Sequence, residues 1–263
     1  MEPTRFKRKT ITMEVLQSQQ QKKNLRRAVF YVGLFLVVTI IFLTVSFAVF
    51  FRVREINISG LQRYGNEEII EALPVKIEDN LYSFRTDELE NIIRRTFPYV
   101  AEVSISRRIP SHLNIEIRET EAAMYTVLAG DYYLLSGELR VLDRITDESL
   151  LPENLILLKT SMVRRCIVGE TASFIDVRTY DAVTELYENI YNNNIRSSIK
   201  SMDLTSRFDI YLQYEDRFSV FMGDMEYVDL KIRFLVGIID KLKDDDKGSI
   251  DVSNHKEAPV ALA

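Results

Sequence analysis

The feature that most constrains this chain is an uninterrupted apolar run near its N-terminus. From Ala28 to Phe51 the sequence is AVFYVGLFLVVTIIFLTVSFAVFF, which is 24 residues without a charge. A helix of that length is about 36 Å long, enough to cross a hydrocarbon core of about 30 Å. The hydroxyls within the run can bond to a carbonyl one turn earlier, so they leave no unsatisfied polar group in lipid. We therefore predict a membrane-spanning helix from Ala28 to Phe51.

A cleaved signal peptide is the competing interpretation of this run. Ser46-Phe47-Ala48 has the small-x-small pattern that a signal peptidase recognises. The apolar core of a signal peptide is roughly 7 to 15 residues long, whereas this run is longer and continues beyond the nominal cleavage site. We therefore favour an uncleaved anchor.

The charges on either side of the run predict its direction in the membrane. Residues 1–27 contain eight Lys or Arg against two Glu, whereas residues 52–71 contain three basic residues. Because basic residues accumulate on the cytoplasmic side of a span, we expect a cytoplasmic N-terminal tail and 212 residues outside the cell membrane.

The part predicted to be exported is acidic. Residues 52–263 contain 26 Lys or Arg and 37 Asp or Glu, a net charge of −11. This charge disfavours binding to nucleic acid or to an anionic lipid surface. Its length suits one or two ordinary domains.

Few residues suited to catalysis or metal binding are present. The chain has one cysteine, Cys166, and two histidines, His112 and His255, so it can form neither an internal disulfide nor a four-cysteine zinc site. The common signatures HExxH, GxxxxGK[ST], GxGxxG and GxSxG do not occur in the sequence. We predict no catalytic, cofactor-binding or metal-binding residues and no small-molecule substrate, and we expect Cys166 to be a small core residue.

Residues 52–119 are predicted to form a small α+β module. Alternation of apolar and polar residues predicts a strand over 53–59, and two short helices follow, capped by Asn66 and Thr86. Two further alternating segments, joined at 109–112, predict a hairpin. The expected order is strand, helix, helix, strand, strand.

Residues 120–253 are predicted to form a second, β-rich domain. Hairpins are expected over 131–142 and 208–222, and helical spacing of apolar residues predicts helices over 183–191 and 228–242. Residues 143–178 gave no clear pattern, and residues 254–263 are expected to be a polar tail. The fold class is therefore α+β, with one transmembrane helix and two exported modules.

Three sequence strings occur in a characteristic order behind the basic tail and the apolar run. They are Ile58-Ser59-Gly60, FPYVAEVSISRRIPSHLNIEIRE at 97–119, and KGSIDVS at 247–253. This arrangement resembles the FtsQ/DivIB family of bacterial divisome proteins, over roughly residues 28–253. The resemblance implies a POTRA domain followed by a β-rich domain. It also implies a non-enzymatic scaffold at the division septum, which joins FtsL and FtsB/DivIC and helps regulate septal peptidoglycan synthesis.

The predicted partner-binding site is the last strand of the β-rich domain. A strand at the edge of a sheet presents unpaired backbone groups, to which a partner can add a strand of its own. The chain turns after the helix at 228–242, then alternates apolar and polar residues, and we expect no later strand to cover it. The FtsQ/DivIB resemblance implies FtsB/DivIC binding at the same place. The predicted residues are Ser249, Ile250, Asp251, Val252, Ser253 and Asn254.

The resemblance also implies a binding or targeting function in the first exported module. We predict that it lies on the second strand of that module, at Val100, Glu102, Ser104 and Ser106.

Two other classes of function remain open from the sequence. A membrane-tethered sensor would need an apolar pocket with convergent polar groups in the β-rich domain. An anchored hydrolase or transferase would need a nucleophile beside a base, and the sequence offers no such pair.

Overall fold

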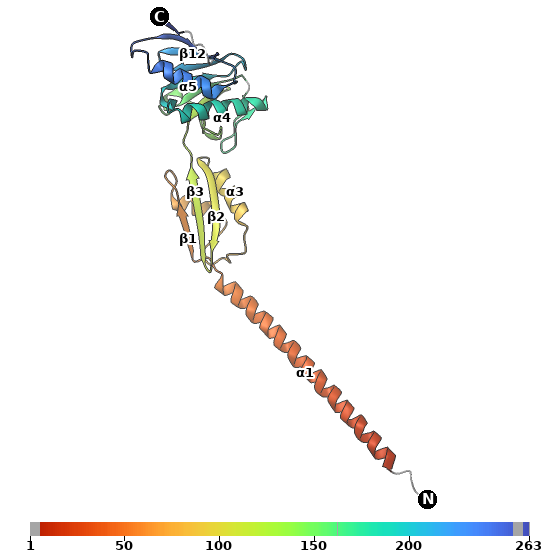
Figure 1. Ribbon diagram of the computed structural model, residues 1–263. Helices are drawn as coiled ribbons and strands as arrows, with labels where there is room; N and C mark the ends of the chain where they lie inside the picture. Colours follow the sequence, from red (N-terminus) through yellow and green to blue (C-terminus); the bar gives the residue numbers. More distant parts are fainter. Residues whose placement is uncertain (1–5, 162, 255–259, 263) are drawn as a thin grey trace. The chain divides into compact units, whose positions relative to one another are not determined.

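The N-terminal helix α1 (Phe6–Phe50) is a single continuous helix (Figure 1). The computed structural model describes residues 6–161, 163–254 and 260–262. Within α1, the segment Asn24–Phe50 reaches a mean hydropathy of 2.7, and by length and composition it can cross a membrane. The hydroxyls of Thr39 and Thr44 donate to the carbonyls of Phe35 and Ile40, at 2.8 Å each, as expected for hydroxyls in lipid.

Backbone contacts divide the chain into two units. The first comprises Met1–Asn57, Val75–Phe84 and Arg107–Leu113, and the second comprises Ile58–Pro74, Arg85–Ser106 and Asn114–Ala263. Strands of the first exported module belong partly to each unit, so this division does not coincide with the domain boundary predicted at residue 119. That boundary stays a prediction.

Within the first unit, the end of α1 is bound by the segment Val75–Phe84. The Leu81 amide donates to the Phe51 carbonyl at 2.7 Å, and the Val53 amide donates to the Asp79 carbonyl at 2.8 Å. The ring of Tyr82 lies 5.5 Å from the rings of both Phe47 and Phe51, measured between centroids. The span therefore ends in an aromatic cluster, a composition typical of membrane–water interfaces.

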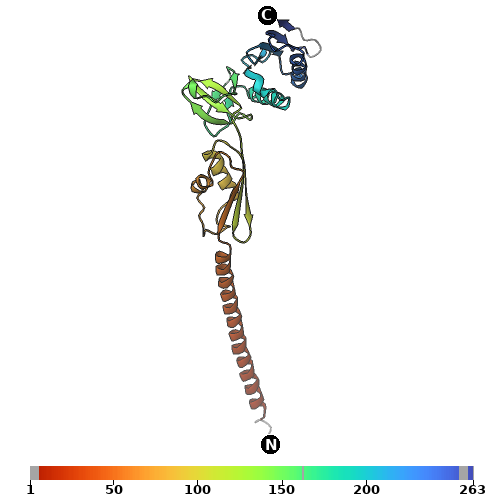
Figure 2. The same cartoon turned by 90° about the vertical axis from the view of Figure 1, so that its left-hand side faces the viewer.

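The first exported module has the predicted order of elements. They are β1 (Glu55–Ser59), α2 (Asn66–Ala72), α3 (Thr86–Thr96), β2 (Val100–Arg108) and β3 (His112–Glu119). The sheet order is β1-β3-β2, so β3 is central and β2 is an edge strand. Figure 2 shows both helices on one side of the three strands.

The predicted helix caps are displaced by one residue. The N-cap positions are Gly65 and Arg85, and neither makes a side-chain capping bond, so Asn66 and Thr86 are the first helical residues rather than caps. Arg85 instead pairs with Asp87 in the first turn, at 2.6 Å.

Burial explains why the helices pack onto this sheet. Helix α3 is strongly amphipathic, with Leu89 and Ile93 at most 1% exposed, while its acidic first turn and basic last turn match the helix dipole. On β3 the alternating residues Leu113, Ile115 and Ile117 are buried.

The C-terminal part is built on a nine-stranded mixed sheet. Its order is β14-β13-β12-β11-β10-β7-β4-β5-β6. The strands are β4 (Met124–Leu128), β5 (Asp131–Leu135), β6 (Val141–Ile145), β7 (Ile156–Lys159), β10 (Ile199–Asp203), β11 (Ile210–Tyr214), β12 (Phe218–Gly223), β13 (Gly248–Asp251) and β14 (Val260–Leu262). Both predicted hairpins are confirmed, as β5–β6 and β11–β12.

Residues 143–178, which gave no pattern in the sequence, include the strand that joins the two halves of this sheet. Strand β7 pairs in parallel with both β4 and β10. The segment also contains the 3-10 helix η1 (Glu148–Leu150) and a separate pair of short strands, β8 (Val163–Arg165) and β9 (Ser173–Phe174).

Two helices pack on this sheet, α4 (Val177–Asn192) and α5 (Val228–Ile239), and a second 3-10 helix, η2 (Arg196–Ser198), follows α4. Both α-helices were predicted from their apolar spacing, and their buried faces join one large core with the strands. The α+β fold class is therefore confirmed.

Candidate interaction edge of the C-terminal sheet

Helix α5 determines where the last strands lie. It connects β12 to β13, and because these two strands are parallel, the connection is a β-α-β unit. The helix buries Val228, Ile232 and Leu235 against the sheet. It also buries Lys231, whose ammonium lies 2.9 Å from the Asp224 carboxylate at the end of β12. Packing of α5 thus returns the chain beside β12.

The acidic turn after α5 is organised by hydrogen bonds within the chain. The Asp246 carboxylate accepts from the Lys243 amide at 2.9 Å, and the Asp246 carbonyl accepts from Nε of Arg217 at 3.1 Å. Arg217 is mostly buried at the start of β12, so it fixes the turn to the strand that β13 joins. The turn Asp244–Asp246 therefore has a structural role in positioning β13.

Strand β13 is fully paired with β12 on one side. The amides of Gly248 and Val252 donate to the carbonyls of Arg217 and Phe221, at 3.0 and 2.9 Å. Because successive amides of a strand point to opposite sides, the Ser249 amide faces away from β12.

The side chains of the predicted site divide between the core and the surface. Ile250 and Val252 are fully buried, so the alternation seen in the sequence reflects a core face. Ser249 is exposed, and Asp251 and Ser253 are partly exposed. A partner at this edge would therefore meet backbone groups and polar side chains.

The expectation that no later strand covers β13 is wrong. Strand β14 pairs with it antiparallel, with Ile250 opposite Val260 and Ser249 opposite Ala261. The predicted polar tail thus contains a short apolar segment, Val-Ala-Leu at 260–262, which adds one strand to the sheet. The first part of that tail, His255–Pro259, lies outside the described residues.

Gly248 allows β14 to come close. Its φ is +152°, and a Cβ placed there would lie 1.9 Å from the carbonyl oxygen of Ala261. A side chain at position 248 would therefore force the two strands apart.

The predicted site in the first exported module is only partly accessible. Strand β2 is an edge strand, and Glu102, Ser104 and Ser106 are exposed. Val100, however, is fully buried, so it is corrected from a contact residue to a core residue. It lies at the start of the strand, where its side chain joins the module's interior.

The outer edge of β2 is also partly occupied. The Ile105 amide donates to the Glu90 side chain at 2.9 Å, so that edge group is already bonded within the chain. Glu102 forms an ion pair with Arg118, and this bond holds the pKa of the Glu102 carboxyl below its usual value. The Ile105 amide is therefore not free to pair with an added strand, whereas Glu102, Ser104 and Ser106 on the face of β2 are exposed.

Of the membrane-spanning residues, Ala28 lies inside α1 and Phe51 lies one residue past its end. Phe51 is partly buried against Tyr82, consistent with a position at the exit from the membrane.

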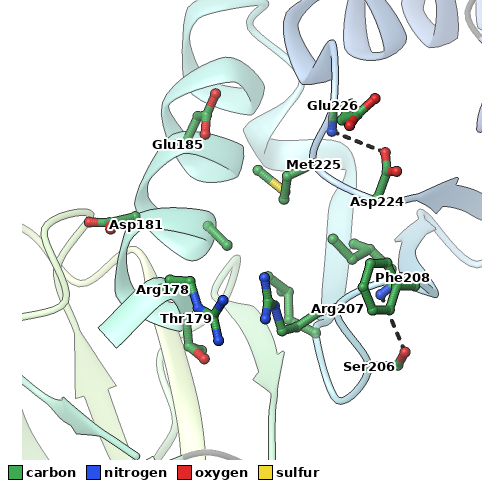
Figure 3. A pocket seen from close by; sticks show the side chains of 13 residues that line it. Arg178, Thr179, Asp181, Glu185, Ser206, Arg207, Phe208, Asp224, Met225 and Glu226 are labelled. Carbon is green, nitrogen blue, oxygen red and sulfur yellow. Dashed lines mark hydrogen bonds between the residues drawn. The ribbon is translucent and has the colours of Figure 1, made fainter. Parts of the chain in front are cut away.

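A cavity that no sequence pattern predicted lies beside α4 and is shown in Figure 3. Its volume is about 440 Å³, and six of its thirteen lining residues are charged. Arg178 and Arg207 converge on Asp176, at 3.0 and 3.8 Å, and the Arg178 bonds hold the Asp176 pKa below its usual value. Its largest apolar contributor, Phe208, is 71% exposed. Charged side chains thus share the lining of this cavity with apolar residues, among them Leu204, Ile210 and Met225.

No group of three His, Cys, Asp or Glu residues lies close enough to hold a metal ion among the residues that the structure describes. Cys166 is partly buried and packs against the main core, in line with its predicted role.

Comparison with known proteins shows what this chain resembles. Residues 51–120 match the model of the FtsQ-type POTRA domain, which covers β1 to β3. The DivIB cell division protein of Clostridium botulinum strain Hall is 25% identical to this chain over 246 residues, 92% of this chain and 93% of that protein. The chain is therefore similar to DivIB cell division proteins over most of its length, and its first module matches the FtsQ-type POTRA domain.

Other relatives show how the similarity is distributed. DivIB of Clostridium acetobutylicum is 25% identical over 80% of this chain and 82% of its own length. FtsQ of Anaeromyxobacter strain K is 33% identical, but over 31% of this chain and 27% of its own length. The similarity to the Clostridium botulinum DivIB protein thus extends over nearly the whole of this chain, which supports a role in cell division as a membrane-anchored protein.

Proposed function

We propose that this protein is a non-enzymatic divisome scaffold of the FtsQ/DivIB type. It binds FtsB/DivIC-like and FtsL-like membrane proteins, other divisome components and no nucleic acid, and it helps regulate septal peptidoglycan synthesis. Its N-terminus is cytoplasmic, its C-terminal modules lie outside the membrane, and the protein acts at the division septum. Similarity to DivIB proteins, an apolar helix that can cross a membrane and the acidic composition of residues 52–263 support this proposal.

The observation that carries the partner-binding proposal is the arrangement of β13. Its inner edge is bonded to β12, and its outer amide at Ser249 faces the side on which the three-residue strand β14 pairs, so a partner strand could add there in place of β14 without disturbing the core. Each added main-chain hydrogen bond contributes about 0.5 to 1.5 kcal/mol net. Because both proteins would be anchored in one membrane, a modest affinity is enough to maintain the contact.

A proline substitution at Ser249, whose amide faces outward from β13, tests the partner-binding proposal. Ser249→Pro removes the donor on the outer edge while leaving the amides that bond to β12, whereas Ser249→Ala keeps the donor and serves as the matched control. We expect Ser249→Pro to abolish capture of an FtsB/DivIC-like partner in pull-down experiments and Ser249→Ala to retain it. Equal capture by both variants would place the binding site elsewhere.

Localisation tests the wider function. A tagged full chain should concentrate at midcell in dividing cells, and uniform distribution around the cell membrane would argue against a division scaffold. Protease treatment of intact spheroplasts should digest residues 52–263, since these lie outside in the proposed topology.

The exposed face of β2 is proposed as a second contact surface, comprising Glu102, Ser104 and Ser106. Glu102→Lys reverses the charge there without touching the core, so it should weaken midcell recruitment while leaving partner capture at β13 intact. Normal recruitment of this variant would remove β2 from the proposal.

A further inference from the structure

Strand β14 occupies the same edge to which a partner strand would add, but it is held by few contacts. It is three residues long and pairs with Gly248, Ser249 and Ile250. Of its residues, Val260 is partly buried and packs against the core, whereas Ala261 and Leu262 are exposed. Leu262 is 55% exposed. A strand this short contributes few main-chain hydrogen bonds.

We propose that β14 is an internal competitor of the partner: Val260–Leu262 covers the outer edge of β13 in the unbound chain, and an extended partner segment binds by displacing it. This inference rests on the proposed function, because it describes how the same edge is regulated. It makes partner capture depend on an equilibrium between a covered and an uncovered edge.

The pairing of β14 specifies the chemistry of the segment that replaces it. Val260 lies opposite the fully buried Ile250, so the displacing segment needs a β-branched or similarly sized apolar residue at that place. The close approach at Gly248 requires extended backbone opposite it. A longer antiparallel segment with this pattern gains more hydrogen bonds than three residues can, which favours displacement.

Only chains with an uncovered edge can bind the partner. The apparent affinity is therefore the intrinsic affinity multiplied by the fraction of chains in which the edge is uncovered. If β14 is docked about 90% of the time, removing it lowers the Kd for the partner about tenfold. If β14 is docked for a larger fraction of the time, its removal lowers the Kd by a larger factor.

The first experiment tests the cover without any partner. We compare hydrogen exchange in the full chain in nanodiscs with that in a chain ending at Asn254. In the truncated chain, peptides containing Ser249 should exchange faster. A synthetic peptide of residues 257–263, added at millimolar concentration, should slow this exchange again in the truncated chain but not in the full chain. Unchanged exchange after truncation would show that β14 does not cover the edge.

The second experiment measures affinity for the exported part of an FtsB/DivIC-like protein. Truncation after Asn254 should tighten binding about tenfold. Val260→Asp should do the same by undocking β14 without shortening the chain, and Ala261→Ser, at an exposed position, should bind like the unmodified chain. Weaker binding after truncation would mean that the partner adds outside β14, and unchanged binding would mean that β14 does not compete. Either result overturns the inference.

The two experiments separate the inference from the proposed function. Faster exchange with no partner binding in any variant would show that the edge is covered but that the partner is misidentified. Partner binding that Ser249→Pro abolishes and that truncation leaves unchanged would keep the proposed function and exclude competition by β14.

Discussion

Nε of Arg107 donates a hydrogen bond to the carbonyl oxygen of Leu81, at 2.8 Å. The same guanidinium donates from Nη2 to the Phe84 carbonyl at 2.6 Å and lies 5.5 Å from the centre of the Tyr82 ring. One side chain of β2 thereby holds the segment whose amide at Leu81 binds the end of the membrane helix.

Replacing Arg107 should loosen this connection. Arg107→Ala removes two charge-assisted hydrogen bonds to backbone carbonyls, so we expect the free energy of unfolding to fall by about 2 kcal/mol. Amides of residues 80–84 should exchange faster. Arg108→Ala, at the exposed neighbouring position, should change stability by less than about 0.5 kcal/mol. Denaturant titration and hydrogen exchange measure both effects, and equal losses in the two variants would contradict the role of Arg107.

The buried Lys231 should make Asp224 important for stability. Its side chain is 2% exposed and bonds to both the carboxylate and the carbonyl of Asp224. Asp224→Asn leaves a buried ammonium without its counter-charge, which we expect to cost about 1 to 2 kcal/mol, because Asp224 itself is partly exposed. Lys231→Met, which removes the buried charge and keeps the length of the side chain, should be close to neutral. A larger loss in Lys231→Met than in Asp224→Asn would refute this account.

The same pair predicts an acid dependence. The hydrogen bond from Lys231 holds the pKa of the Asp224 carboxyl below its ordinary value of 3.8. A lowered pKa in the folded state stabilises the fold above the unfolded value, and this stabilisation is lost as pH falls through the folded value. The stability difference between the unmodified chain and Asp224→Asn should therefore be full at pH 6 and shrink below about pH 4. Unfolding titrations at several pH values measure it, and a constant difference would argue against the pair.

Substitutions at Gly60 and Gly130 distinguish the cost of backbone strain at positive φ from the cost of a steric clash with a neighbouring strand. Both glycines have left-handed backbone, at +88° and +92°, but a Cβ at Gly60 would lie 1.9 Å from the Ile117 carbonyl oxygen, whereas Gly130 has nothing within 4 Å. Gly130→Ala should cost about 1 kcal/mol through backbone strain alone. Gly60→Ala should cost at least about 2 kcal/mol more, because it also forces β1 away from β3. Similar thermal shifts for both would show that the clash relaxes freely.

Cys166 should react slowly in the folded chain. Burial raises the pKa of its thiol to about 11 from its ordinary value of 9.0. At pH 8 this lowers the thiolate population about 100-fold, and the thiolate is the reactive form. Maleimide labelling should therefore be slow in native protein and fast in urea. Rapid labelling of the native chain would mean that the thiol is exposed.

Patterns within single elements were enough to predict much of this fold. The uncharged run predicted the part of α1 that begins at Ala28, although not its extension back to Phe6, and the 3.6-residue spacing of Val228, Ile232 and Leu235 predicted α5. Alternation along β3 and along the β11–β12 hairpin likewise identified these strands. In each case the signal lies in one continuous segment with one buried face.

The features that the sequence did not predict depend on contacts between distant segments. Strand β7 has four residues and pairs in parallel on both sides, so no hairpin turn marks it. Strand β14 has three residues, too few for a period to be recognised. Burial of Val100 depends on its place at the start of β2, which alternation along the strand does not determine. The cavity beside α4 is formed by three separate segments and has no local signature.

The far end of the nine-stranded sheet is protected by its own loop. At β6, the Val141 amide donates to the Glu170 carbonyl and the Gly169 amide donates to the Val141 carbonyl, both at 2.8 Å. At the other end, the outermost strand has three residues. Open strand edges promote aggregation, and short or occupied edges limit it. Among the described strands of this sheet, neighbouring copies crowded into one membrane would therefore meet a strand of three residues at one end and an edge occupied at Val141 at the other, which limits pairing between their sheets.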